Sequence, residues 1–253
     1  MNTENSIDSG CPFDWGLTSE HYSQFRDIYP QKLYEKLRKL GVGADNTSWL
    51  DLGTGTGILP QNMYNSACSI TAVDISEEQI SYAKSNADKN GWNINYFVSS
   101  AETTNLPSHT FDCITAAQCF DYFDRNIMKS EIKRLLKNGG LFVKVYMDWC
   151  LDDEIANKSV SLVKKYNSKW NDRIGHMNIY DDIFNDRITD TFYSEIPFTR
   201  ESWHGRMCAC RGTLASMKDD IFKAWSSDHI QMLMDYPECF TIKHKIYISY
   251  FKL

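Results

Sequence analysis

The chain has 253 residues, a net charge of −6 at pH 7, 42% hydrophobic residues and 24% charged residues, which suits one globular α/β domain with insertions. The acidic charge, without a Lys/Arg run, argues against general binding of duplex nucleic acid, because phosphate contacts need clustered cations. No apolar run is long enough to cross a bilayer, and the polar, acidic N-terminus is unlike a secretory signal.

Up to residue 147 the sequence predicts a parallel sheet covered by helices. From Ser48 onward, short apolar runs alternate with longer amphipathic segments, as in α/β proteins. Ser76 and Gln79 have capping-box spacing. One or two helices are expected over residues 12–40, before the sheet. The expected strands are 48–52, 69–74, 93–98, 111–117 and 141–146, and the expected helices are 57–66, 76–90 and 125–136, the last ended by Asn138-Gly139-Gly140.

After residue 147 the pattern changes. Residues 148–186 mix aromatic side chains with many Asp, Asn and Lys residues and show no clean strand signal. We interpret this part of the chain as a cap inserted into the sheet domain. The later elements are expected to be strands over 188–198 and 240–251 and helices over 199–207 and 218–234.

The strongest chemical signal is the glycine-rich segment 50–57, Leu-Asp-Leu-Gly-Thr-Gly-Thr-Gly. It joins the first strand to the first helix, where open α/β sheets bind ligands, and its glycines allow a sharp turn close to a ligand. Its spacing differs from the dinucleotide fingerprint, because Ile58 stands where the third glycine would be. Asp51 at its head favours a ligand with an amino group over a pyrophosphate. The alternative is a tight strand-to-helix turn without a ligand.

Asp74 is the second signal. It ends the second strand about 20 residues after the glycine loop, where an acidic side chain can accept hydrogen bonds from both ribose hydroxyls. A helix-capping role is the alternative, but Ser76 already has the capping position. The sequence therefore favours a ligand that carries a ribose.

Together these residues resemble the class I S-adenosylmethionine-dependent methyltransferases over residues 50–146. Ser100-Ala101-Glu102 looks like the family's adenine-reading motif, although Ser100 stands where many relatives have Asp. Residues 111–118 look like the motif near the sulfonium, and residues 135–140 resemble the turn before the fifth strand. The cofactor-binding residues that the resemblance implies are Asp51, Gly53, Thr54, Gly55, Gly57, Asp74, Ile75, Ala101, Glu102, Ala117 and Gln118.

The resemblance also extends to the N-terminal aromatic residues. Tyr22, Phe25, Arg26 and Tyr29 are similar to a segment of the small-molecule branch, which includes enzymes related to trans-aconitate methyltransferase. In that branch an aromatic helix folds over the methionine end of the cofactor. This implies a cofactor contact for Tyr29 and a place beside the reacting groups for Tyr22. Simple packing of the N-terminal helix would explain the same aromatic residues equally well.

The sequence gives less information about the residues that bind the methyl acceptor. Methyl transfer from a sulfonium is an in-line displacement, so the protein mainly aligns the acceptor and removes a proton where needed. His204 is a candidate base, because imidazole changes charge near neutral pH, and Arg206 or Arg211 could clamp a carboxylate or phosphate. The alternative is that these arginines pair with surface acids and Trp203 is core. The candidates that follow the fourth strand are Gln118, Cys119, Phe120, Tyr122 and Phe123.

We therefore expect an α/β fold with a Rossmann-like, doubly wound seven-stranded sheet whose last strand is antiparallel. A single domain over residues 1–253 is expected to divide into an N-terminal helical lid, a cofactor-binding core, cap insertions with the sixth strand, and a final strand. The boundaries are 1–45, 46–147, 148–236 and 237–253.

The expected function is S-adenosylmethionine-dependent methyl transfer to a small-molecule acceptor, without nucleic-acid or membrane partners. The alternatives are a protein or nucleic-acid methyltransferase and a binding protein that holds S-adenosylmethionine without catalysis. The glycine spacing disfavours a nicotinamide oxidoreductase. No metal site is expected, because the Cys208–Cys210 pair lacks further ligands at suitable spacing. The eight scattered cysteines suggest a reducing, cytoplasmic location.

Overall fold

The structure is a computed structural model that describes residues 8, 14, 29–171 and 183–253. These residues divide into two compact units. The sheet unit holds residues 29–147, 183–192 and 246–253, and the helical unit holds residues 8, 14, 148–171 and 193–245. Within the described residues, no helix combines the length and hydropathy needed to cross a bilayer.

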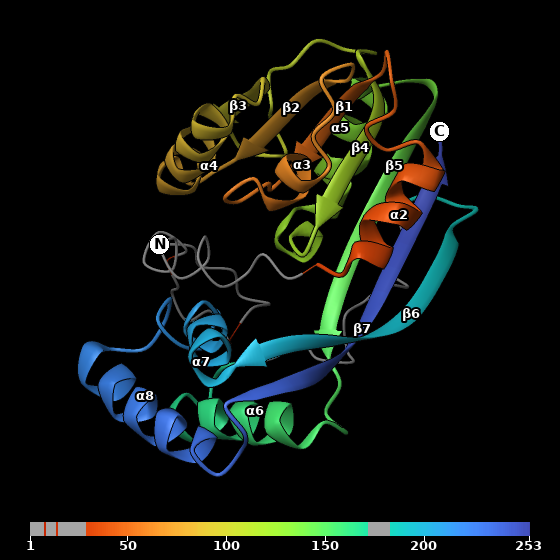
Figure 1. Ribbon diagram of the computed structural model, residues 1–253. Coiled ribbons are helices and arrows are strands. Elements are labelled where there is room, and N and C mark those ends of the chain that lie inside the picture. The colour runs from red at the N-terminus through yellow and green to blue at the C-terminus, as the bar shows by residue number, and fades with distance from the viewer. Residues whose placement is uncertain (1–7, 9–13, 15–28, 172–182) are drawn as a thin grey trace. The chain divides into compact units, whose positions relative to one another are not determined.

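A seven-stranded sheet in the order β3-β2-β1-β4-β5-β7-β6 forms the framework of the fold (Figure 1). The first five strands pair in parallel, and β7 runs antiparallel. This confirms the predicted Rossmann-like α/β sheet with its antiparallel last strand. The strands are β1 (Ser48–Leu52), β2 (Ser69–Asp74), β3 (Ile94–Val98), β4 (Phe111–Ala117), β5 (Leu136–Trp149), β6 (Ile188–Thr199) and β7 (Cys239–Lys252).

The central strand of the sheet unit is β1. Leu50 lies opposite Thr71 of β2 and Ile114 of β4, so β1 is paired on both edges. Leu50 and Leu52 are fully buried, as expected for a strand covered on both faces. The carboxyl ends of β1, β2 and β4 carry Asp51, Asp74 and Ala117.

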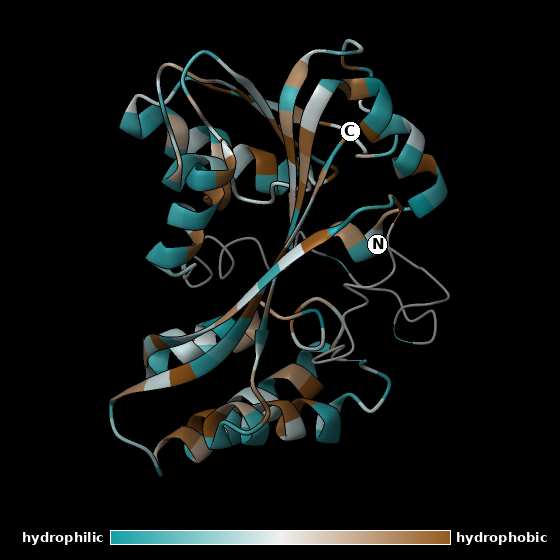
Figure 2. Cartoon of the chain, turned by 90° about the vertical axis from the view of Figure 1, so that its right-hand side faces the viewer, coloured by the Kyte–Doolittle hydropathy of each residue, from teal (hydrophilic) through white to brown (hydrophobic). Residues whose placement is uncertain are grey.

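Amphipathic helices accompany the strands of the sheet unit, and Figure 2 shows hydrophilic and hydrophobic residues side by side along them. Ser76 caps α4, accepting a hydrogen bond from the Gln79 amide at 3.3 Å, which confirms the expected cap. Of the helices expected over 12–40, α2 is present, and residues 15–28 lie outside the described part. The elements are α2 (Gln31–Leu40), α3 (Ile58–Asn62), α4 (Glu77–Asn90), the 3-10 turn η3 (Phe120–Tyr122) and α5 (Arg125–Leu135).

The helical unit contains α6 (Glu154–Tyr166), α7 (Arg200–Cys208) and α8 (Asp219–Leu233). Its core includes Trp203, which is fully buried and contacts Trp149 at 5.6 Å and Phe198 at 4.9 Å between ring centroids. The sequence predicts no helix over residues 154–166, where the structure has α6.

The start of β5 also differs from the prediction. Residues 138–140 were expected to form a turn, but β5 begins at Leu136, directly after α5. The Gly139 amide donates to Leu253 O at 2.6 Å, and the Leu253 amide donates to Gly140 O at 3.0 Å. This pairing with the end of the chain turns the glycine segment into strand. The division into lid, core and cap stays a prediction.

Candidate functional site

The glycine loop after β1 adopts backbone conformations that favour glycine. Gly53 has φ +60° and Gly57 has φ +81°. A Cβ on Gly53 would lie 2.8 Å from Cys119 Sγ, and one on Gly57 would lie 2.5 Å from Tyr96 Oη. Gly55 also has φ +60°. The loop therefore requires glycine for its conformation and, at two positions, for space.

Asp51, at the head of this loop, is almost fully buried and held by a neighbouring strand. Its Oδ1 accepts a hydrogen bond from Thr115 Oγ1 at 2.5 Å, and Thr115 Oγ1 accepts one from Trp49 Nε1 at 2.8 Å. Burial raises the pKa of Asp51 to about 7, although the Thr115 hydrogen bond opposes the shift. A bound cation beside this carboxyl would restore its ionised form. The carboxyl is therefore suited to a ligand's ammonium group.

Thr115 is a site residue that the sequence analysis missed. It lies directly opposite Asp51 in the β1–β4 register and is fully buried. The available signal was a polar side chain inside the apolar run 111–117, because buried hydroxyls need a hydrogen-bond partner.

Asp74 shapes the glycine loop and retains acceptor capacity. Its Oδ2 accepts from the Gly55 amide at 2.8 Å, and its Oδ1 accepts from the Ser76 amide at 2.9 Å. Burial raises the pKa of Asp74, and these backbone hydrogen bonds oppose the shift. Each carboxylate oxygen has a second lone pair for another donor. The next side chain, Ile75, is 63% exposed and offers an apolar surface beside this carboxylate.

The Ser100–Glu102 segment is closely bonded to itself and to α5. The Ser100 hydroxyl donates to Glu102 Oε2, and the Glu102 amide donates to Ser100 Oγ at 3.2 Å. Glu102 Oε1 accepts from the Asp124 amide at 3.1 Å, and Ala101 between them is buried. Both oxygens of Glu102 thus have protein donors, and direct contact of Glu102 with adenine stays a prediction.

Gln118 follows β4 with a left-handed backbone, φ +60°. Its Nε2 donates to Met147 O at 2.7 Å and its Oε1 accepts from the Met147 amide at 3.1 Å. The side chain thereby extends the hydrogen bonding between β4 and β5 beyond Ala117. The next residue, Cys119, donates from Sγ to Leu52 O at 3.1 Å, and burial raises the pKa of its thiol well above the ordinary value. Both side chains hold the end of β4 in place.

The remaining aromatic candidates of the sheet unit have partners of their own. Phe120 is buried and contacts Phe123 edge to face, with 5.8 Å between ring centroids. Tyr122 is half-buried in the same turn. Tyr29 contacts Tyr34 of α2 edge to face at 6.3 Å. Tyr22, Phe25 and Arg26 lie outside the described residues.

His204 belongs to a hydrogen-bonded group inside the helical unit. Its Nδ1 lies 2.9 Å from His229 Nδ1, and its Nε2 lies 3.1 Å from Ser226 Oγ. The ring stacks on Trp225 at 5.5 Å. His229 is fully buried, and its Nε2 lies 3.0 Å from Ser159 Oγ. Burial, with a smaller effect from His204, lowers the pKa of His229 to about 3.

The arginine candidates are buried in the same unit. The Arg206 guanidinium lies 5.1 Å from the Trp149 ring centroid. Arg211 forms an ion pair with Asp8 at 2.5 Å and donates to Asn171 O at 2.6 Å. Trp203 donates from Nε1 to Ser159 Oγ at 2.9 Å. These contacts fit structural roles, and acceptor binding by His204, Arg206 or Arg211 stays a prediction.

Residues 50–144 match the protein family described as "Methyltransferase domain". A Dictyostelium discoideum protein named as a methyltransferase is 31% identical over 140 residues, which cover 52% of this chain and 48% of that protein. A ubiquinone biosynthesis O-methyltransferase of Coxiella burnetii is 33% identical over 92 residues, which cover 36% of this chain and 39% of that protein. The chain thus spans less than half of the length of either relative.

A solved structure from Anaeromyxobacter dehalogenans, named as a type II methyltransferase, has the same fold, with a TM-score of 0.61 and 20% identity. The match covers 88% of this chain and 95% of that one. Residues 50–144 are therefore similar in sequence to methyltransferase domains, and the fold is that of a solved methyltransferase. The match supports the predicted class of protein and its cofactor, S-adenosylmethionine, for this part of the chain.

Proposed function

We propose that this protein transfers the methyl group of S-adenosylmethionine to a small-molecule acceptor. The observation that carries the proposal is the pair of carboxyl groups at the ends of β1 and β2, Asp51 and Asp74, with the glycine loop between them. The two carboxyls match the two polar ends of one ligand, an ammonium group and a ribose diol. S-adenosylmethionine carries both and supplies an electrophilic methyl group.

Different residues of the sheet unit bind different parts of the cofactor. Asp51 and the loop that includes Gly53, Thr54, Gly55 and Gly57 receive the methionine end. Because the loop presents backbone amides without side chains at its glycines, it can approach the ligand closely.

Asp74 accepts the ribose hydroxyls through its remaining lone pairs, and Ile75 covers one face of the adenine with its exposed side chain. Ala101 and Glu102 lie along the adenine edge. Ala117 and Gln118 end β4 near the reacting centre. Tyr29 is the proposed contact of the methionine end, and a role for Tyr22 beside the reacting groups stays a prediction.

The chemistry needs alignment more than acid–base groups. The acceptor's lone pair attacks the methyl carbon while the bond from that carbon to sulfur breaks, and the electron pair goes to sulfur. Fixing the acceptor in line with that bond can lower the barrier by about 7–11 kcal/mol. Where the acceptor carries a proton, His204 is the proposed base, and Arg206 is the proposed partner of an anionic acceptor group.

The protein's charge and a relative support a small-molecule acceptor. The net charge of −6 disfavours nucleic acid, and one relative is named a ubiquinone biosynthesis O-methyltransferase. Formation of S-adenosylhomocysteine with small molecules, but not with protein or RNA extracts, would support this choice. Turnover with the extracts alone would favour the macromolecular alternative, and binding without any turnover would favour a non-catalytic role. A cytoplasmic location remains our expectation.

Calorimetric titration tests cofactor binding directly. We expect micromolar binding of S-adenosylmethionine and S-adenosylhomocysteine and no binding of NAD. Asp74→Asn should weaken cofactor binding by roughly 10- to 100-fold, the effect of losing hydrogen bonds to a charged acceptor. Asp88→Asn, an exposed change on α4, is the matched control. Absence of cofactor binding would reject the proposal, and unchanged affinity in Asp74→Asn would reject the ribose role.

A further inference from the structure

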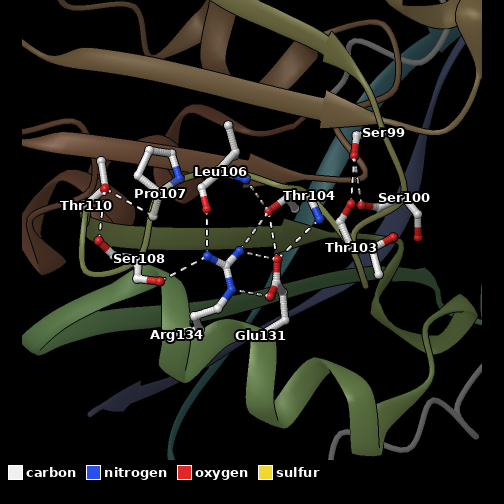
Figure 3. A network of polar contacts seen from close by, with 10 residues as sticks. All are labelled: Ser99, Ser100, Thr103, Thr104, Leu106, Pro107, Ser108, Thr110, Glu131 and Arg134. Carbon is white, nitrogen blue, oxygen red and sulfur yellow. Dashed lines mark hydrogen bonds and ion pairs between the residues drawn. The ribbon is translucent and has the colours of Figure 1, made fainter.

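The segment between β3 and β4, which carries Ser100–Glu102, is bonded to the side of α5 (Figure 3). Glu131 of α5 is 8% exposed, and its Oε1 accepts from both the amide and the hydroxyl of Thr104, at 3.2 and 2.7 Å. Thr104 is itself buried. The amide and the hydroxyl of Thr104 thus both donate to this one carboxylate oxygen.

Arg134, one helical turn further along, completes the contact. Its Nε and Nη2 donate to the two oxygens of Glu131, both at 2.7 Å, in a bidentate pair. Its Nη1 reaches Leu106 O at 2.6 Å and Ser108 Oγ at 3.2 Å. Although burial opposes it, the hydrogen bonds from Arg134 and Thr104 lower the pKa of Glu131. The pair therefore stays ionised at neutral pH.

The same segment has two other attachments. The Ser99 amide donates to Asp74 O at 2.8 Å, and Glu102 Oε1 accepts from the Asp124 amide where α5 begins. Between Thr104 and Leu106, Asn105 has φ +56°, a left-handed conformation that asparagine adopts more readily than most residues with a side chain. Glu131 and Arg134 are bonded to the residues on either side of this turn, Thr104 and Leu106.

We propose that Glu131 and Arg134 are positioning residues for the adenine end of the cofactor. They hold Thr104 and Leu106, and through them they fix the position of Ser100–Glu102, while their own hydrogen bonds are made to the protein. The inference rests on the proposed function and deepens it. It predicts that changes at α5 alter how well the protein distinguishes the base of the cofactor.

The test compares binding of S-adenosylhomocysteine with binding of S-inosylhomocysteine, in which a keto oxygen replaces the exocyclic amine. Glu131→Gln keeps the size of the side chain but removes its charge. We expect it to weaken S-adenosylhomocysteine binding by about tenfold and to reduce the preference for adenine over hypoxanthine. Turnover at saturating S-adenosylmethionine should change by less than about threefold, because the reacting end is untouched.

Three further variants test whether the effect arises from the contact between α5 and this segment. Arg134→Lys keeps the charge but cannot form the bidentate pair with Glu131, so it should lose part of the preference for adenine over hypoxanthine. Thr104→Val combined with Glu131→Gln should cost less than the sum of the single changes, because both act through one contact. Glu154→Gln breaks the Glu154–Lys158 ion pair of α6, in the helical unit, and should change nothing.

The outcomes separate the two proposals. If Glu131→Gln and Arg134→Lys both keep the wild-type affinity and base preference, the positioning role is overturned while the proposed function stands. Equal losses for both nucleosides would also overturn it, because a general loss of folding does not distinguish the bases. If Glu131→Gln does not fold, Arg134→Lys decides in the same way. Failure of the wild-type protein to bind S-adenosylhomocysteine would instead reject the proposed function.

Discussion

The raised pKa of Asp51 predicts that cofactor binding depends on pH. In the free protein the pKa is about 7, because the carboxyl is buried. An ammonium group bound beside it favours the ionised form, so binding near neutral pH releases a proton. The carboxyl is ionised in about one-tenth of molecules at pH 6 and about nine-tenths at pH 8. Affinity should therefore rise about tenfold over that range, with about half a proton released at pH 7.

Thr115→Val is the perturbation that tests this reasoning. The change removes the hydroxyl that donates to Asp51 Oδ1 at 2.5 Å. A hydrogen bond to a charged group contributes about 1.5–3 kcal/mol, so the pKa of Asp51 should rise by a further one to two units. At pH 7 the variant should then bind about 5- to 50-fold more weakly than the wild type. Thr115→Ser keeps the hydroxyl and is the control.

The assay is calorimetric titration with S-adenosylhomocysteine between pH 6 and 8, in two buffers of different ionisation enthalpy. The difference between buffers gives the number of protons released. Comparing affinities of variant and wild type at each pH cancels the titration of the ligand's own amino group. Because Trp49 Nε1 also loses its acceptor, thermal unfolding should be followed in parallel. Superimposable profiles for Thr115→Val and wild type, or binding without proton release, would refute the argument.

Two further predictions concern stability, measured by urea unfolding. Gly53→Ala should cost about 1–3 kcal/mol more than Gly91→Ala, because both positions have positive φ but only the first would bring a Cβ against Cys119; equal losses would contradict this. The folded pKa of His229, about 3, lies below its ordinary value, so the unfolded chain binds a proton that the folded chain excludes. Stability should fall as pH drops below about 6.5, by up to about 1.4 kcal/mol per pH unit, and His229→Gln should flatten this slope. A wild-type slope in that variant would assign the effect to other groups.

The sequence predicts correctly those elements whose structure depends on residues close together in the chain. The strands 48–52, 69–74 and 111–117 have the predicted bounds, because each is a short apolar run between turn-forming residues. The glycine loop was recognised for a similar reason, since its conformation is a property of its own residues. The Ser76 cap is another contact within one helical turn.

Long-range contacts explain most of what the sequence could not predict. The strand at 139–140 depends on pairing with Leu253, more than 100 residues away in the sequence. The side chain of Gln118 is bonded to Met147 only because β4 and β5 lie side by side. Local sequence contains no signal for either contact.

Helix α6 is different, because a local signal for it was present. Ile155, Val160 and Val163 are buried on one face of the helix, and Asp153 accepts from the Ala156 amide at 3.0 Å as an N-cap. The many charged and aromatic residues around it obscured this spacing.

The hydrogen bonds of His204 and His229 in the helical unit determine which ring nitrogens carry the protons. Ser159 donates its hydroxyl hydrogen to Ile155 O at 2.8 Å, so it can only accept from His229 Nε2. His229 is therefore the Nε2–H tautomer, and its bare Nδ1 accepts from His204. His204 must be the opposite tautomer, with Ser226 donating to its Nε2. All these hydrogen bonds thus share one direction, from Ser226 through the two imidazole rings and Ser159 to the Ile155 carbonyl.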